Sequence, residues 1–416
     1  MAEKLANSLP SAILATFTSI SNDAAAECLA GFSVRDWKRL GNWFHASGLA
    51  LYFLDSIRNR GIERALPAGV MEELHQNQSD NRERMASLFQ EFAQLNAEFG
   101  HEGLDFINIK GFSLGPEYCA TPGLRSQFDL DFWVRKDHAE RCKAVMQRLG
   151  YQIVESRDTL ECHTGGDAYP KLRDFYKPSR RRSVEIHLLS AEEFAQIPKA
   201  NGLLNGFVFP VLPREQMFVQ QAGHLAKHLR SEWTRASWML ELRNAIADGR
   251  HDSKFWRDME EQCASQAART AIGIAVAATA KVFRASIPPE LGGWAVASLP
   301  AGVLRWVDEY SERVVTAQFP GTKLYMLLSR ELAADGREFE KQRRVVLLPV
   351  RMPGYIATQK GSETNLRTHA LHAKYAAMRL RFHVREGLRL LRAERAWRKP
   401  AHRTSTSVAT RGSSIA

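Results

Sequence analysis

Hydrophobic positions recur at helical spacing through the first hundred residues. Ser33 followed by Asp36 is an N-cap signature, and the segment after it places apolar side chains every three or four residues. A longer apolar stripe extends from Met71 to Phe99, and Gly100 is positioned to end that helix. Residues 1–99 are therefore expected to form an N-terminal helical region.

The spacing of apolar residues changes at about residue 104. Leu104–Ile109 is a short apolar run, and residues 128–134 alternate, with Phe128 and its alternate apolar neighbours on one face and acidic residues on the other. A period of two is typical of a β-strand. Further expected elements are a helix over 137–149 and strands over 151–154, 171–176 and 183–189, the last two forming a hairpin around residues 177–180.

Helical patterns return after this region and continue almost to the end of the chain. They cover residues 215–229, 233–246, 252–283, 300–335 and 363–398. The pattern predicts an α+β fold, in which a small mixed β-sheet core is flanked by N- and C-terminal helical regions. The expected units are a helical region (1–99), the sheet core (100–210), a helical domain (211–335), a basic helical region (336–399) and a disordered tail (400–416).

The composition argues against a disordered protein, a membrane-spanning protein and a disulfide-rich protein. One quarter of the 416 residues are charged and 44% are hydrophobic, so most of the chain is able to bury a core. No window has the roughly 18 uncharged apolar residues that a membrane span needs. The five cysteines contain no CxxC pair, which argues against a disulfide framework or a structural zinc site. We expect a cytoplasmic protein.

The excess of positive charge belongs to the C-terminal region. Residues 331–416 contain 18 Lys and Arg against 7 Asp and Glu, whereas the first 330 residues contain 39 of each kind. A basic helical region attracts nucleic acid, acidic lipid or another acidic partner, and salt weakens that attraction. The alternative is a solvated helix face followed by a loose tail.

Two aspartates form the strongest candidate site. Asp129 and Asp131 lie two residues apart on an expected strand, so both side chains project from one face about 7 Å apart. Carboxylates held this close repel each other unless a cation lies between them, and Mg²⁺ prefers such oxygen ligands. The alternative for an isolated D-x-D motif is a solvent-facing strand edge.

Three neighbouring features favour the metal site. Lys110, Gly111 and Ser113 follow the first expected strand; here glycine lets backbone N–H groups approach an anion, and lysine and serine add a charge and a hydroxyl for phosphate. Arg125 either orients the carboxylates, binds phosphate or forms a structural ion pair. Glu185 shares a strand face with His187 and offers a third carboxylate.

Other polar clusters weigh less. His224 and His228 are four residues apart and share a helix face, but no Glu follows the first of them, which excludes the HExxH metalloprotease motif. Core or capping histidines, or residues that position a substrate, are the alternatives for this pair. Residues 180–182 are three arginines beside the Glu185 strand, in a solvated turn or in contact with phosphate.

Taken together, these motifs resemble uncharacterised bacterial nucleotidyltransferases of the polymerase-β-like superfamily. The resemblance rests on Lys110-Gly111 after a strand, Arg125-x-x-x-Asp129-x-Asp131 on the next strand, and Gly150-Tyr151 after a helix. Glu185-x-His187 on a later strand completes the order, and the helix with His224 and His228 extends it. The resemblance covers roughly residues 60–250.

The resemblance implies a function and a role for each residue. Asp129, Asp131 and Glu185 would bind Mg²⁺, with Mn²⁺ as a substitute, and Glu185 would also serve as general base. Lys110, Gly111, Ser113 and Arg125 would bind the nucleotide, while His187, His224 and His228 would position substrate. The implied reaction transfers an NMP group from an NTP to an unidentified hydroxyl acceptor and releases pyrophosphate.

Two departures from the family pattern leave an alternative open. The third carboxylate is Glu where Asp is more frequent, and Phe112 separates Gly111 from Ser113 where the superfamily has Gly-Ser. The alternative is a non-catalytic nucleotide-binding or regulatory module on the same fold.

Overall fold

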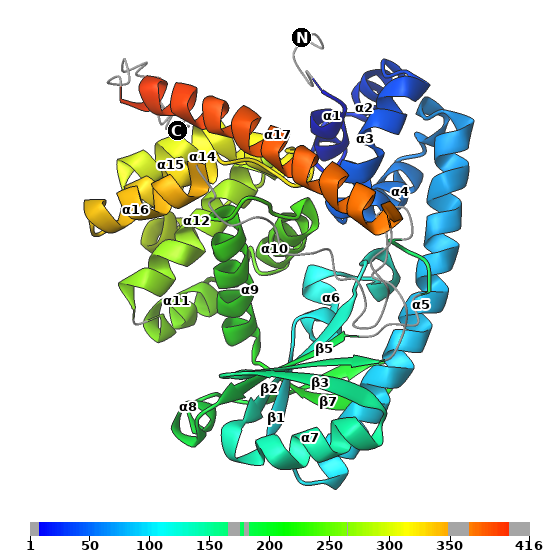
Figure 1. The fold of residues 1–416 in the computed structure, drawn as a ribbon, viewed down its shortest axis with the longest axis vertical. Helices are drawn as coiled ribbons and strands as arrows, with labels where there is room; N and C mark the ends of the chain where they lie inside the picture. The colour runs from blue at the N-terminus through cyan, green and yellow to red at the C-terminus, as the bar shows by residue number, and fades with distance from the viewer. Residues whose placement is uncertain (1–7, 165–174, 179–182, 264, 348–365, 399–416) are drawn as a thin grey trace, which may run out of the picture.

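The structure places helices at both ends of the chain and one mixed sheet between them. This computed structural model describes residues 8–164, 175–178, 183–263, 265–347 and 366–398. Figure 1 shows the sheet at one end of the molecule and most of the C-terminal helices at the other. The expected α+β class is therefore confirmed. The expected boundaries between units stay predictions, and the tail over 400–416 and the three arginines at 180–182 lie outside the described residues.

The N-terminal region is helical, as the apolar spacing predicted. Ser33 and Asp36 form a complete capping box at the start of α3, each side chain bonding the other residue's backbone N–H. The tryptophans and phenylalanines of α3 and α4 face inward, and Trp43 and Phe53 are almost fully buried. The helices are α1 (Leu9–Ala15), α2 (Asn22–Ala30), α3 (Val34–Ala46), α4 (Ala50–Asn59) and α5 (Ala68–His101).

The end of α5 differs from the prediction. Gly100 lies inside the helix, which continues to His101. The chain reverses at Gly103, which has a φ of 61°, and the Leu104 N–H donates to the Phe99 carbonyl at 2.9 Å. The prediction for Gly100 was wrong because the left-handed conformation that ends the helix falls three residues later.

Seven strands form one mixed sheet. Their spatial order is β3-β4-β5-β2-β1-β7-β6. β2 pairs in parallel with β5 and antiparallel with β1, and β1 pairs in parallel with β7. The strands are β1 (Phe106–Ile109), β2 (Asp129–Arg135), β3 (Tyr151–Ser156), β4 (Thr159–Thr164), β5 (Ser183–Leu189), β6 (Ala200–Leu204) and β7 (Phe207–Val211).

Three of these strands were not predicted. The expected hairpin of residues 171–176 with 183–189 is wrong as a pairing, because the neighbours of β5 are β4 and β2. Residues 171–174 lie outside the described part of the chain, and Phe175 and Tyr176 form a turn. The β6–β7 hairpin has Asn205 and Gly206 at its turn, both with positive φ, which is a recognised two-residue hairpin signal.

One face of the central strands packs on helices and leaves the opposite face for chemistry. Phe132 of β2 is fully buried and its ring packs edge-on against Phe99 of α5 at 5.2 Å. Val184 and Ile186 of β5 are also fully buried. Helix α7 (Ala139–Arg148) lies beneath the sheet in Figure 1 and contacts β3. This alternation turns Asp131 and Glu185 away from that packed face.

The C-terminal helices are more divided than predicted. The expected helix over 252–283 is two helices, because Asp252 caps α11 and Ser265 caps α12. The expected helix over 300–335 is likewise interrupted between α14 and α15. The principal elements are α9 (Arg214–Leu229), α10 (Ala236–Asp248), α11 (Ser253–Gln262), α12 (Gln266–Phe283), α14 (Ala301–Val315), α15 (Tyr325–Glu331), α16 (Gly336–Leu347) and α17 (Leu366–Trp397). The short helix α13 (Pro289–Leu291) lies between α12 and α14, whereas α6 (Gly115–Tyr118) lies between β1 and β2 and α8 (Ala191–Ala195) between β5 and β6.

A helix that spans a membrane must be both long and apolar. Within the described ranges, every helix is too short or too polar to cross a bilayer.

Candidate active site

The parallel pairing of β2 with β5 brings the predicted acidic residues together. Asp131 lies directly opposite Glu185 in the register, and Trp133 lies opposite His187. Residues opposite each other on paired strands project from the same face with their Cβ atoms about 5 Å apart. The strand order thus places a third carboxylate beside the D-x-D pair.

His187 links the carboxylates of this cluster. Its Nε2 lies 3.7 Å from Asp131 Oδ1 and 3.8 Å from Glu185 Oε2. One ligand atom from each of Asp131, Glu185 and His187 falls within 4.8 Å of the others. Two carboxylate oxygens and an imidazole nitrogen at this separation fit a divalent cation. The types of donor atom and their spacing are therefore suitable for a divalent metal ion, with His187 as an additional donor.

Electrostatics distinguish the two aspartates. Burial raises the pKa of Asp129 to about 6, with the neighbouring Asp131 adding to the increase. Burial also opposes ionisation of Asp131, but the nearby His187 and the hydrogen bond from Lys110 lower the pKa of this carboxyl below its usual value. Asp131 is thus held as an anion by its neighbours, whereas Asp129 lacks comparable support and is the carboxylate that would gain most from a nearby cation.

The ammonium group of Lys110 is the positive charge that contacts the acidic cluster. Its Nζ lies 2.6 Å from Asp131 Oδ1. Burial acts to lower the pKa of Lys110, but Asp131, Asp129 and Glu185 together raise it. Lys110 has a φ of 59°, which is rare for a residue with a side chain, and this backbone aims the lysine at the carboxylates.

The turn after Lys110 depends on glycine. Gly111 has a φ of 51°, and a Cβ there would lie 2.3 Å from the Gln127 Nε2 atom. The buried Ser113 hydroxyl donates to the Lys110 carbonyl at 2.6 Å, so this side chain shapes the turn. Gly111 lines a cavity of about 330 Å³ that also contacts Arg125, Gln127 and the β6–β7 turn. The turn therefore borders an open cavity.

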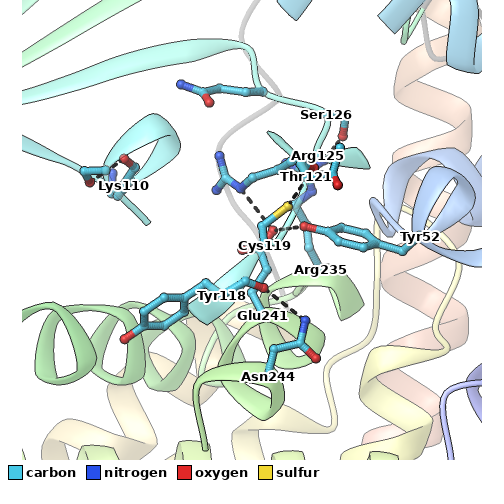
Figure 2. A network of polar contacts seen from close by, with 12 residues as sticks. Tyr52, Lys110, Tyr118, Cys119, Thr121, Arg125, Ser126, Arg235, Glu241 and Asn244 are labelled. Atoms are coloured by element: carbon cyan, nitrogen blue, oxygen red, sulfur yellow. Dashed lines mark hydrogen bonds and ion pairs between the residues drawn. The ribbon is translucent and has the colours of Figure 1, made fainter. Parts of the chain in front are cut away.

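Arg125 lies in a buried polar network. Its Nε donates to Glu241 Oε1 at 3.0 Å, and the Tyr52 hydroxyl donates to the same oxygen at 3.0 Å. Figure 2 shows Tyr52, Arg125 and Glu241 gathered near Cys119, with Lys110 apart from this group. The geometry matches the structural ion pair, one of the alternatives considered for Arg125.

The two predicted histidines pack against a tryptophan. The rings of His224 and His228 lie 4.7 and 4.4 Å from that of Trp238 on α10. Burial lowers the pKa of His224 to about 3 and that of His228 to about 4. Lys110 is among the positive charges that lower both pKa values. Both histidines are neutral near pH 7.

Sequence patterns did not identify Glu241 or Arg235 as parts of this region. Glu241 is one helix turn inside α10 and only 2% exposed, and Arg235 directly precedes α10. Both come from a helix more than one hundred residues after Asp131. A buried acid in an otherwise apolar helix stripe was the available signal for Glu241, because such a residue requires a partner.

The chain was also compared with solved structures. The matches include the antibiotic-resistance factor ANT(2″)-Ia, with 12% identity, 40% of this chain and 85% of that chain covered, and a TM-score of 0.30. The lincosamide antibiotic adenylyltransferase LnuA matches at 12% identity over 35% of this chain and 89% of that chain, with a TM-score of 0.25. An antigenic nucleotidyltransferase-like protein from Paracoccidioides brasiliensis matches at 9% identity over 49% and 93%, with a TM-score of 0.29.

Comparison with protein families is more informative. No curated protein matches the chain. The model of a family described as an uncharacterised nucleotidyltransferase matches residues 33–284, which is more than half of the chain and includes the β2–β5 acidic cluster. The protein belongs to this nucleotidyltransferase family.

Proposed function

We propose that the protein transfers an NMP group from an NTP to a hydroxyl acceptor and releases pyrophosphate. The observation that carries this proposal is the β2–β5 register, which puts Glu185 beside Asp131 on one strand face. Asp129, Asp131 and Glu185 would hold Mg²⁺, or Mn²⁺ in its place, with His187 as a further donor. A divalent cation at this position supplies charge stabilisation for the transferring phosphoryl group. We place the activity in the cytoplasm.

Glu185 and His187 have separate roles in the proposed transfer. Glu185 has a side chain that is 37% exposed, so an acceptor hydroxyl is able to reach it. As the acceptor oxygen bonds to the α-phosphorus, the bond from that phosphorus to the pyrophosphate oxygen breaks, and Glu185 takes the hydroxyl proton. His187 keeps Glu185 and Asp131 in position through its two contacts.

Lys110 is the residue that responds to nucleotide. Its ammonium neutralises part of the charge on Asp131 before substrate arrives. When nucleotide and cation bind, Lys110 turns from Asp131 to an oxygen of the triphosphate, and the backbone at Gly111 leaves room for this approach. Ser113 and Arg125 support the site by holding the turn and the segment before β2. His224 and His228 offer neutral edges for positioning substrate.

A nucleotide panel tests this proposal. Thermal unfolding is measured with ATP, GTP, CTP and UTP, each with Mg²⁺ or EDTA, for wild type and Asp131→Asn. A ligand at 100 times its dissociation constant stabilises the folded state by about 2.7 kcal/mol. We expect a Mg²⁺-dependent shift in wild type that the variant lacks, and pyrophosphate release once the acceptor is supplied. Asp258→Asn, in a surface pair with Lys254, serves as a control that keeps the shift.

The non-catalytic alternative makes a different prediction. A nucleotide-binding or regulatory module would show the thermal shift without pyrophosphate release across sugars, small metabolites, protein hydroxyls and RNA ends. No shift with any nucleotide would refute both versions of the proposal.

We also propose an acidic partner, such as a nucleic acid, for the basic C-terminal region. Helix α17 and the segment from Tyr310 to Leu324 line a groove of about 1000 Å³. Arginine is the most frequent residue along it: Arg313, Arg381, Arg385, Arg389 and Arg392. Among the described residues, Glu386 is the one acidic residue that lines the groove, so the groove attracts anions.

A further inference from the structure

Helix α17 has an exposed apolar face. Five of the twelve large apolar side chains that are exposed among the described residues belong to this one helix. Four of the five recur at intervals of three or four residues and therefore lie on one side of the helix. They are Leu380, Val384, Leu388 and Leu391, with exposed fractions of 67%, 55%, 51% and 37%. Apolar side chains gathered in this way on a surface mark an interaction site.

Another side of α17 is already engaged by the protein itself. Glu386, Leu390 and Glu394, each four residues apart, are 5% exposed or less. The Glu394 carboxylate accepts two hydrogen bonds of 2.7 Å from Arg343 on α16, and Glu386 Oε2 accepts one of 2.8 Å from the Thr322 hydroxyl. Figure 1 shows α17 crossing the C-terminal helices on the near side of the molecule. The helix is thus fixed by one side, and its apolar face lies outside these contacts.

A row of positive charge runs beside the apolar face. Each of its four apolar residues is followed directly by an exposed arginine: Arg381, Arg385, Arg389 and Arg392. Consecutive residues of a helix are about 100° apart, so these arginines form a second row parallel to the apolar one. The sequence of α17 contains two acidic residues, Glu386 and Glu394, and both are buried. The helix therefore presents an apolar row and a cationic row side by side, and both of its carboxylates face the protein.

A lipid surface with anionic headgroups fits both rows. A basic amphipathic helix lies in the plane of such a surface, where its apolar face enters the boundary of the acyl chains and its cations reach the phosphates. A nucleic acid would use the arginine row but leave the leucines in water. A second copy of the chain would cover the leucines but bring two arginine rows together, and like charges across an interface repel.

We propose that α17 docks the protein on an anionic lipid surface, with Leu380, Val384, Leu388 and Leu391 entering the acyl boundary and the arginine row contacting lipid phosphates. This surface is one particular acidic partner for the basic C-terminal region, and binding to it does not depend on the proposed transfer reaction. Salt should weaken the docking because it screens the arginines, but should not abolish it, because apolar burial is not screened.

Vesicle flotation of the full chain tests this docking. The vesicles contain phosphatidylcholine alone, or equal parts of phosphatidylcholine and phosphatidylglycerol. We expect wild type to bind the anionic vesicles at least about tenfold more tightly than the neutral ones. Leu380→Ser/Leu388→Ser should weaken this binding by about tenfold or more, because two leucines no longer leave water. Arg381→Gln/Arg385→Gln/Arg392→Gln should weaken it at least as much, because each cation near the surface contributes about fivefold.

Two variants elsewhere serve as matched controls. Val154→Ser removes an apolar side chain that is 58% exposed on the edge strand β3, and Lys254→Gln removes an exposed cation of α11. Both should bind the anionic vesicles as wild type does. Leu380 and Leu388 are more than half exposed, so their variants should remain folded, and circular dichroism checks each protein.

A second measurement separates lipid from the other occupants. Leu380→Ser/Leu388→Ser should bind a single-stranded oligonucleotide as wild type does in fluorescence anisotropy, because only the arginine row would contact phosphates of a nucleic acid. Absence of wild-type binding to anionic vesicles, or equal binding by wild type and the leucine variant, overturns the lipid inference. So does a wild-type dimer that the leucine variant turns into a monomer in sedimentation velocity, since a second copy then covers the stripe. Pyrophosphate release is assayed separately without vesicles, so the docking and the transfer reaction can each fail alone.

Discussion

The buried pair of Arg125 and Glu241 gives the sharpest test of how the site is built. The Glu241 side chain is 3% exposed and that of Arg125 is 14% exposed, with 3.0 Å between Nε and Oε1. Glu241→Leu leaves the guanidinium buried without its anion, which typically costs about 3–5 kcal/mol. The same substitution removes the acceptor of the Tyr52 hydroxyl, worth about 1 kcal/mol. We therefore expect a loss of about 4–6 kcal/mol in the free energy of unfolding.

Urea unfolding followed by tryptophan fluorescence measures this loss. The double variant Arg125→Met/Glu241→Leu should recover most of it, since replacing both charges by apolar groups is often close to neutral. Asp258→Asn, which breaks the exposed pair with Lys254, should change stability by less than about 0.5 kcal/mol. A Glu241→Leu loss below about 1 kcal/mol would refute the structural pair and leave Arg125 available for phosphate.

Three further predictions follow from the site and the charge distribution. Asp131→Asn should lower NMP transfer by about 10³-fold or more, the scale of removing one group that stabilises a transferring phosphoryl group, in a pyrophosphate-release assay with the fold checked by circular dichroism. The pKa of His228 is lowered to about 4 in the folded protein, so the contribution of this residue to stability is complete above about pH 6.5 and is lost as pH falls toward 4. In urea titrations, His228→Asn should therefore remove about 1–2 kcal/mol of the difference in unfolding free energy between pH 7 and pH 5. If the variant has the same pH profile as wild type, His228 is not a neutral, buried histidine. Replacing Arg381, Arg385 and Arg392 of α17 by Gln should weaken anisotropy-measured binding of a single-stranded oligonucleotide and flatten its salt dependence, whereas Lys254→Gln should not; binding that is equally salt-sensitive in both would place the acidic partner elsewhere.

The sequence predicted the strand that carries the chemistry because burial leaves a clear pattern there. Leu130, Phe132 and Val134 alternate with Asp129, Asp131 and Trp133, and the three aliphatic and phenyl side chains are buried in β2. The Ser33–Asp36 capping box was equally readable, since its two hydrogen bonds are local in sequence. Features that depend on a few neighbouring residues, such as strand alternation and helix caps, are therefore predictable from the sequence.

Pairing between distant segments was harder to predict. β5 was expected to pair with residues 171–176, but its partners are β4 and β2, which are chosen by packing across the whole sheet. The β6–β7 hairpin was not predicted, because its two strands are short, although Asn205-Gly206 at its turn is a local hairpin signal. Glu241 and Arg235 are brought to this region by the tertiary packing of α10, so their distance along the chain does not predict that they lie near Asp129.

The charge balance of the cluster explains why Lys110 contacts a carboxylate and not open space beside its turn. Asp129, Asp131 and Glu185 bring three negative charges, and Lys110 returns one positive charge, so two negative charges are left. One divalent cation would balance them. Asp131 can favour either the ammonium or the metal, but close approach of both would crowd like charges. A bound triphosphate would resolve this competition, because its oxygens would accept hydrogen bonds from the ammonium and leave Asp131 free for the cation. Nucleotide and cation should therefore each strengthen the binding of the other.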